Sequence, residues 1–145
     1  MFFFGQFEHT IDAKGRLTIP SNFRQLVPGG VYVTQGFERN LAVYSTEMFE
    51  SIATNIGKLS ITDSETRLLR RFIFANTAKL DFDTAGRILI PNYLKELAGL
   101  NSTVIIAGAG MNFEIWSPEQ WIKQSNMFRD PEANASRWNA MEVST

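Results

Sequence analysis

The residues best suited to chemistry occur twice in this chain, as an aspartate followed four positions later by an arginine. The pairs are Asp12 with Arg16 and Asp83 with Arg87, and a glycine precedes each arginine. A nearby carboxylate can hold the planar guanidinium in one orientation, and an oriented guanidinium binds phosphate groups and guanine edges through two hydrogen bonds. A single pair of this kind is more often an exposed ion pair that rigidifies a turn and contributes well under ~1 kcal/mol.

The two pairs belong to a longer internal repeat. Residues 11–20 align with residues 82–91 at a constant offset of 71, and Asp, Gly, Arg, Ile and Pro recur at the same positions. After a shift of one residue, the apolar segment at 41–44 falls opposite the segment at 113–116. Identical residues at fixed positions within a matching apolar pattern predict that the chain contains two copies of one structural unit.

Each copy predicts the same series of elements. Aspartate at the first position of a turn and glycine at the fourth favour a type I turn followed by a left-handed residue, as in a three-residue hairpin loop. The strand after the turn ends at Pro20 or Pro91, where a short helix is expected to begin. Ser45 and Ser117 are predicted to cap the short helices that follow the last strand of each copy. The other strands are expected at 31–33, 41–44, 104–106 and 113–116.

The predicted fold is α+β and mainly β, with two tandem repeats and short flanking helices. Residues 1–60 form the first repeat in this prediction, and residues 79–128 form the second. A capping box at 62–65 begins an amphipathic linking helix within 61–78, and residues 129–145 are expected to be a poorly ordered polar tail. Because about 70 residues build only a weak core, we expect the two repeats to fold as one unit with a shared β-barrel-like core.

Composition restricts the partners and sites that this chain can have. The net charge of −1 argues against nonspecific coating of nucleic acid, so a nucleic-acid surface must be a local feature. The chain has no cysteine and one histidine, and we expect no metal, cofactor or small-molecule substrate. The apolar start at Phe2-Phe3-Phe4 is too short for a signal peptide or a membrane span. We therefore expect these phenylalanines in the core or a subunit interface of a cytoplasmic protein without a membrane partner.

Residues 7–20 and 80–91 resemble the two signatures of the MraZ family, and the resemblance covers roughly residues 1–125. It implies a double-split β-barrel related to AbrB-type swapped-hairpin folds. It also implies a nucleoid-associated transcriptional regulator that binds double-stranded DNA at direct repeats in its own promoter, upstream of the division and cell-wall gene cluster. The resemblance further implies a ring-shaped homo-oligomer. By the same resemblance, the DNA-binding residues are Lys14, Gly15, Arg16 and Arg87, oriented by Asp12, Asp83 and Gly86.

The two copies differ at the tip of the turn. Lys14 lies there in the first copy, whereas Ala85 replaces it in the second copy and Asp81 adds a negative charge nearby. Residues 1–71 are also the more basic part of the chain, with eight Lys or Arg and seven Asp or Glu. If DNA is the partner, the first copy is the better equipped to bind it.

An acid hydrolase is the strongest enzymatic alternative. Residues 83–86, Asp-Thr-Ala-Gly, resemble the Asp-Thr-Gly motif of aspartic proteases, in which two aspartates share one proton. The first copy has Ala13 and Lys14 where such a motif would supply a hydroxyl group. An arginine four residues after each aspartate also favours two ionised carboxylates. We therefore expect no catalytic residue.

Two non-enzymatic alternatives remain open. The chain could be a ring-forming scaffold whose hairpins serve assembly rather than DNA binding. DNA could also contact the linking helix, although a solvated or inter-subunit face is the simpler interpretation of its basic side. That basic side consists of Arg67, Arg70 and Arg71, and the predicted apolar side consists of Leu68, Leu69, Phe72 and Ile73.

Overall fold

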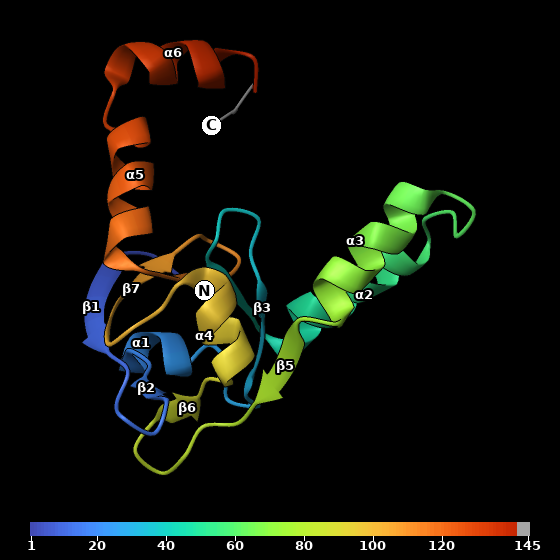
Figure 1. Ribbon diagram of the computed structural model, residues 1–145. Helices are drawn as coiled ribbons and strands as arrows, with labels where there is room; N and C mark the ends of the chain where they lie inside the picture. Colours follow the sequence, from blue (N-terminus) through green and yellow to red (C-terminus); the bar gives the residue numbers. More distant parts are fainter. Residues whose placement is uncertain (142–145) are drawn as a thin grey trace.

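The strands of the two copies pair with each other. In the computed structural model, which describes residues 1–141, β1 (Gln6–Thr10) of the first copy is antiparallel to β7 (Thr103–Gly108) of the second. Likewise, β5 (Thr77–Leu80) of the second copy is antiparallel to β3 (Val31–Gln35) of the first. These exchanges make the two copies parts of one body, which lies at the lower left in Figure 1, with one helical arm above it and the other to its right.

Six strands form one antiparallel sheet in the order β1-β7-β8-β4-β3-β5. Its centre is the pair β4 (Leu41–Tyr44) and β8 (Phe113–Trp116), which again joins the two copies. A separate two-stranded ribbon consists of β2 (Arg16–Thr18) and β6 (Arg87–Leu89). The predicted fold, α+β with a split β-barrel built from two tandem repeats, is confirmed.

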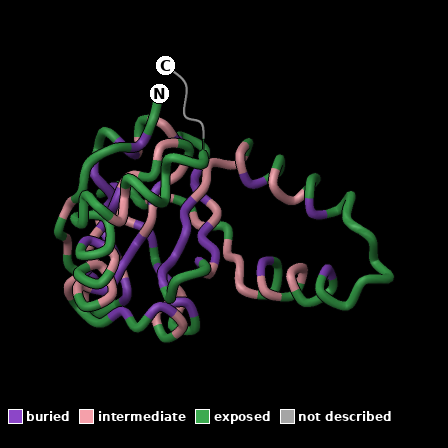
Figure 2. The backbone as a smooth tube through the Cα atoms, turned by 90° about the horizontal axis from the view of Figure 1, so that it is seen from above, coloured by how far each residue is buried: buried purple, intermediate pink, exposed green. Residues whose placement is uncertain are grey.

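The main core cluster contains residues of both copies. Phe3 and Phe23 of the first copy meet Phe113 of the second, with ring centroids 5.0 Å apart for Phe23 and Phe113. Figure 2 shows the buried residues concentrated in the body of the molecule. Of the initial phenylalanines, only Phe3 is in the core, whereas Phe2 and Phe4 are 61% and 72% exposed.

Two short helices follow the ribbon strands and close the core. They are α1 (Ser21–Arg24), which starts after Pro20, and α4 (Asn92–Ala98), which starts after Pro91, as predicted. Both helices bury apolar side chains in the core, Phe23 in α1 and both Leu94 and Ala98 in α4. The prolines thus end the ribbon strands and turn the chain back over the core.

The first arm consists of α2 (Thr46–Gly57) and α3 (Ser64–Phe74), which pack together through Phe49, Ile56 and Ile73. The Ser45 hydroxyl accepts a hydrogen bond from the Met48 amide at 3.1 Å, so the predicted cap of α2 is confirmed. That helix has 12 residues, however, and is not short.

The predicted capping box at the start of α3 is wrong by one residue. Asp63 is the N-cap, and its carboxylate accepts from the Glu65 amide at 3.0 Å. The Thr62 hydroxyl instead lies 2.8 Å from the Ser60 hydroxyl. An ionised carboxylate at the positive end of a helix is a strong acceptor, which explains why Asp63 takes this position.

The second arm consists of α5 (Pro118–Phe128) and α6 (Pro131–Asn139), and Ser117 caps α5 as predicted. The expectation of a poorly ordered tail from residue 129 is wrong for residues 131–139. Asp130 accepts hydrogen bonds from the Glu132 and Ala133 amides, and Pro131 occupies the first turn, so this segment carries strong helix-start signals. The last residues of the predicted tail, 142–145, lie outside the described residues. Within residues 1–141, each helix is too short or too polar to span a membrane.

Because the core is shared, a destabilising core substitution in the first copy should also destabilise the second copy. Leu17→Ala removes a fully buried side chain of the first copy and should lower the free energy of unfolding by about 2–5 kcal/mol. Trp116 and Trp121 lie in the second copy and Trp138 lies in α6 beyond it, so tryptophan fluorescence during urea denaturation should report this loss. Leu89→Ala, at a 57% exposed position on the same ribbon, is the matched control. An unchanged tryptophan midpoint in Leu17→Ala would contradict a shared core.

Candidate nucleic-acid interface

The turn of each copy is closed by two backbone hydrogen bonds. In the first copy, the Asp12 amide donates to the Arg16 carbonyl at 3.0 Å, and the Gly15 amide donates to the Asp12 carbonyl at 2.9 Å. The second copy repeats both bonds between Asp83, Gly86 and Arg87. Gly15 and Gly86 have φ values of +86° and +77°, the left-handed conformation that was predicted from the turn.

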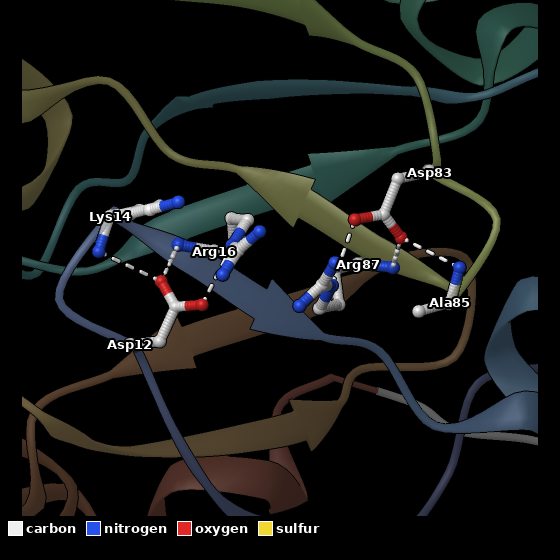
Figure 3. Close-up of polar contacts among 6 residues, drawn as sticks. All are labelled: Asp12, Lys14, Arg16, Asp83, Ala85 and Arg87. Carbon is white, nitrogen blue, oxygen red and sulfur yellow. Dashed lines mark hydrogen bonds and ion pairs between the residues drawn. The ribbon is translucent and has the colours of Figure 1, made fainter.

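Each aspartate orients its arginine in the same way (Figure 3). One carboxylate oxygen of Asp12 accepts from the backbone amides of Lys14 and Arg16, and the other accepts from Arg16 Nε at 2.7 Å. Asp83 makes the equivalent bonds, with Arg87 Nε at 2.8 Å. Because only Nε is engaged, the two terminal nitrogens of each guanidinium form no hydrogen bond within residues 1–141. These nitrogens can therefore donate to an external ligand.

The turns also keep both carboxylates ionised. The backbone amide of Arg16, followed by its side chain, lowers the pKa of Asp12 below its usual value of 3.8 by donating hydrogen bonds to the carboxylate. Arg87 lowers the pKa of Asp83 in the same way, its backbone amide first. Figure 3 shows the two arginines lying between the two aspartates. This arrangement argues against a proton shared by the carboxylates, which an acid hydrolase would require.

The two arginines lie on one face of one ribbon. In the antiparallel pairing of β2 and β6, Arg16 is opposite Leu89 and Arg87 is opposite Thr18. Since alternate residues point to opposite sides, these four side chains share the outer face, while the intervening Leu17 and Ile88 are fully buried. The sequence predicted two separate hairpins and did not reveal this ribbon, because each of its strands has only three residues.

The remaining predicted site residues lie around this ribbon. Lys14 is exposed at the tip of the first turn, and Ala85 is exposed at the tip of the second. Gly15 and Gly86 are buried, and each uses its carbonyl to accept a hydrogen bond from the opposite copy: Ile90 donates to Gly15 at 2.9 Å and Ile19 donates to Gly86 at 3.1 Å. The two glycines therefore link the copies rather than facing outward.

The basic side of α3 has a structural explanation for two of its three arginines. Arg67 Nη1 donates to the Ile61 carbonyl at 2.8 Å, and Arg70 Nη2 donates to the carbonyls of Gly57 and Leu59. These bonds hold the loop that connects α2 and α3. Arg67 and Arg70 are thus engaged within the first arm, unlike the terminal nitrogens of the ribbon arginines.

Comparison with known proteins gives the same result for both halves of the chain. A family model described as "MraZ protein, putative antitoxin-like" matches residues 2–72 and matches again at residues 73–139. A protein of Roseiflexus castenholzii named transcriptional regulator MraZ is 44% identical over 134 residues, which cover 92% of each chain. The regulators of that name from Thermomicrobium roseum and Dictyoglomus thermophilum are 41% and 44% identical. The alignment with the first of these covers 86% of this chain and 88% of the relative, and the alignment with the second covers 82% of each.

The hydrogen bonds of the first turn predict how its aspartate titrates. Asp12 should have a pKa below 3.8, so the contribution of the turn to stability is present at neutral pH and is lost as the pH falls through that lowered pKa. Arg16→Met should raise the pKa of Asp12 only partly, because the backbone amide of residue 16 still donates. Carboxyl ¹³C chemical shifts measured against pH would check both values. A pKa at or above 3.8 in the unchanged protein would contradict the geometry.

Proposed function

This chain belongs to the MraZ family, and on that premise we propose that it is a transcriptional regulator that binds double-stranded DNA through the outer face of the β2–β6 ribbon. One observation carries the proposal: Arg16 and Arg87, each oriented by its own aspartate, project from one face of an exposed two-stranded ribbon. A two-stranded β-ribbon fits the major groove of B-DNA, and arginines on it can contact base edges. No catalytic step and no cofactor is part of this function.

The two kinds of basic residue have different tasks. The terminal nitrogens of Arg16 and Arg87, which have no partner among the described residues, match the O6 and N7 acceptors of guanine, which bind one guanidinium through two hydrogen bonds. The aspartates prevent the guanidinium groups from rotating away, so less side-chain entropy is lost on binding. Lys14, exposed at the first tip, is suited to a phosphate, since an ammonium group is a compact charge without a fixed plane.

The regulator acts as a ring-shaped homo-oligomer in this proposal. One chain of net charge −1 has too few cations for tight binding, whereas linked subunits on repeated sites raise the effective concentration. Two separate apolar surfaces support head-to-tail assembly. The first lies on the first arm, where Phe37 stacks on Phe72 beside the exposed Leu68. The second is a groove of about 470 Å³ at the second arm, lined by Trp121 and Trp138 among others.

The proposed target is a set of direct repeats in the regulator's own promoter, upstream of the division and cell-wall gene cluster, and the protein is proposed to act at the nucleoid. A closed ring presents copies of one ribbon in the same rotational sense, whereas a twofold dimer requires a palindrome. Footprinting of the protein on the DNA upstream of its own gene should therefore reveal protected boxes in tandem. Protection of a single inverted repeat would contradict the ring.

The oligomer should depend on the apolar surface of the first arm. Leu68 is 59% exposed, so Leu68→Asp should leave the fold intact and reduce the mass measured by light scattering, because a buried unpaired carboxylate opposes assembly. Leu59→Asp, at a 45% exposed position near the end of the same arm, should keep the mass of the unchanged protein. A monomeric mass for the unchanged protein at micromolar concentration would refute the ring itself.

The two copies should contribute unequally to DNA binding, and this experiment tests the proposed function. Arg16→Ala should abolish specific binding, because each contacting subunit loses roughly 1–3 kcal/mol of discrimination. Arg87→Ala should weaken binding less, because the second turn has less positive charge around its arginine: Ala85 stands at the position equivalent to Lys14, and Asp81 adds a negative charge nearby. Binding is measured by mobility shift on the upstream DNA, with light scattering to verify that the variants stay assembled. An assembled Arg16→Ala with unchanged affinity would mean that the turn is structural, as in the scaffold alternative.

A further inference from the structure

A second pair of basic residues lies against the turns, beyond those that carry the proposed function. Arg24 is the last residue of α1, and Lys95 lies in the last turn of α4. The two positions differ by 71, the offset of the repeat, so they are equivalent residues of the two copies. Both side chains are partly buried beside the ribbon.

Each of these residues lies over the turn of the opposite copy. A Cβ atom placed on Gly86 would lie only 2.5 Å from Arg24 Cζ, and one on Gly15 would lie 3.5 Å from Lys95 Nζ. The crossing follows from the ribbon, because the residues that precede α1 and α4 are bonded to the opposite turn through Ile19 and Ile90. The glycine of the first turn, Gly15, therefore lies next to Lys95, a cation that belongs to the second copy.

The two cations differ in their bonding. Arg24 Nη1 donates to the Ile19 carbonyl, so its guanidinium is engaged in joining the end of β2 to the second turn. Lys95 Nζ makes no hydrogen bond and no ion pair within residues 1–141. The Lys95 ammonium group lies beside Gly15. In the sequence, Gly15 stands between the exposed Lys14 and Arg16, whose guanidinium is oriented by Asp12. The carboxylate of that turn, Asp12, is already bonded to Arg16.

We propose that Lys95 binds a DNA phosphodiester next to the base pair contacted by Arg16, so that the DNA site of the first turn is completed by the second copy. The proposal rests on the proposed function, because it adds a contact to the same interface. Three cations then surround the first turn: Lys14 and Arg16 from the turn itself and Lys95 from α4. Because Lys95 Nζ has no partner within residues 1–141, it can donate to an external anion, and phosphate is the anion that lies beside the groove.

The test compares Lys95→Met, Lys95→Arg and the control Lys58→Met, whose exposed lysine ends α2 on the first arm. The probe is a fluorescent duplex of the DNA upstream of the gene, and the affinity is measured as a function of salt concentration. Lys95→Met should weaken binding at low salt and reduce the slope of log K against log salt by about 0.9 per contacting subunit. Lys95→Arg should restore the slope, and Lys58→Met should leave it unchanged.

The outcomes separate this contact from the function on which it rests. If the unchanged protein binds the duplex and Lys95→Met has the same slope, the Lys95 contact is refuted while the regulator proposal stands. If Lys95→Met loses its assembled mass in light scattering and Lys95→Arg restores the mass but not the slope, Lys95 is structural and the contact is likewise refuted. If the unchanged protein does not bind the duplex, the proposed function itself fails.

Discussion

Two hydrogen bonds between the copies determine where every basic residue of the candidate interface lies. Ile19 donates to the carbonyl of Gly86, and Ile90 donates to the carbonyl of Gly15, so the end of each ribbon strand is fixed to the turn of the other copy. These bonds extend the pairing of β2 with β6 and bring the two turns to opposite ends of one ribbon. Without the crossing, Arg16 and Arg87 would belong to two independent hairpins with no defined relation to each other.

The glycines at these positions meet two requirements at once. The turn needs a residue with positive φ, and the opposite copy needs close access to the turn backbone. A Cβ atom on Gly86 would overlap the guanidinium of Arg24, and one on Gly15 would lie 3.3 Å from the Ile90 carbonyl. The aspartate then fixes the other side of the turn by accepting two backbone amides and one side-chain nitrogen. The orientation of each arginine is therefore determined by local bonds, and its position by the crossed strands.

The local elements could be predicted from the sequence, because their causes are local. The left-handed glycines, the helices after Pro20 and Pro91 and the serine caps of α2 and α5 all follow from neighbouring residues. The pairing of strands could not be predicted, since the repeat pattern is the same whether a copy pairs with itself or with the other copy. The helix at 131–139 was missed because its polar composition outweighed the Asp130-Pro131 start signal. Lys95 was missed because its neighbour, Gly15, is 80 positions away in the sequence.

The duplication also bears on the kind of DNA site that one chain can recognise. Two identical copies would give a ribbon with twofold symmetry, which would present the same side chains in either direction along the groove. The outer face departs from this symmetry, because Thr18 of the first copy corresponds to Leu89 of the second. The tips depart from it as well, since Lys14 corresponds to Ala85. The supporting cations also differ, because Lys95 has no partner within residues 1–141 whereas the equivalent Arg24 donates to the Ile19 carbonyl. On the proposed function, this divergence gives the ribbon a direction. A directional ribbon favours a non-palindromic box. Because the subunits of the proposed ring present their ribbons in the same sense, such boxes must follow one another as direct repeats.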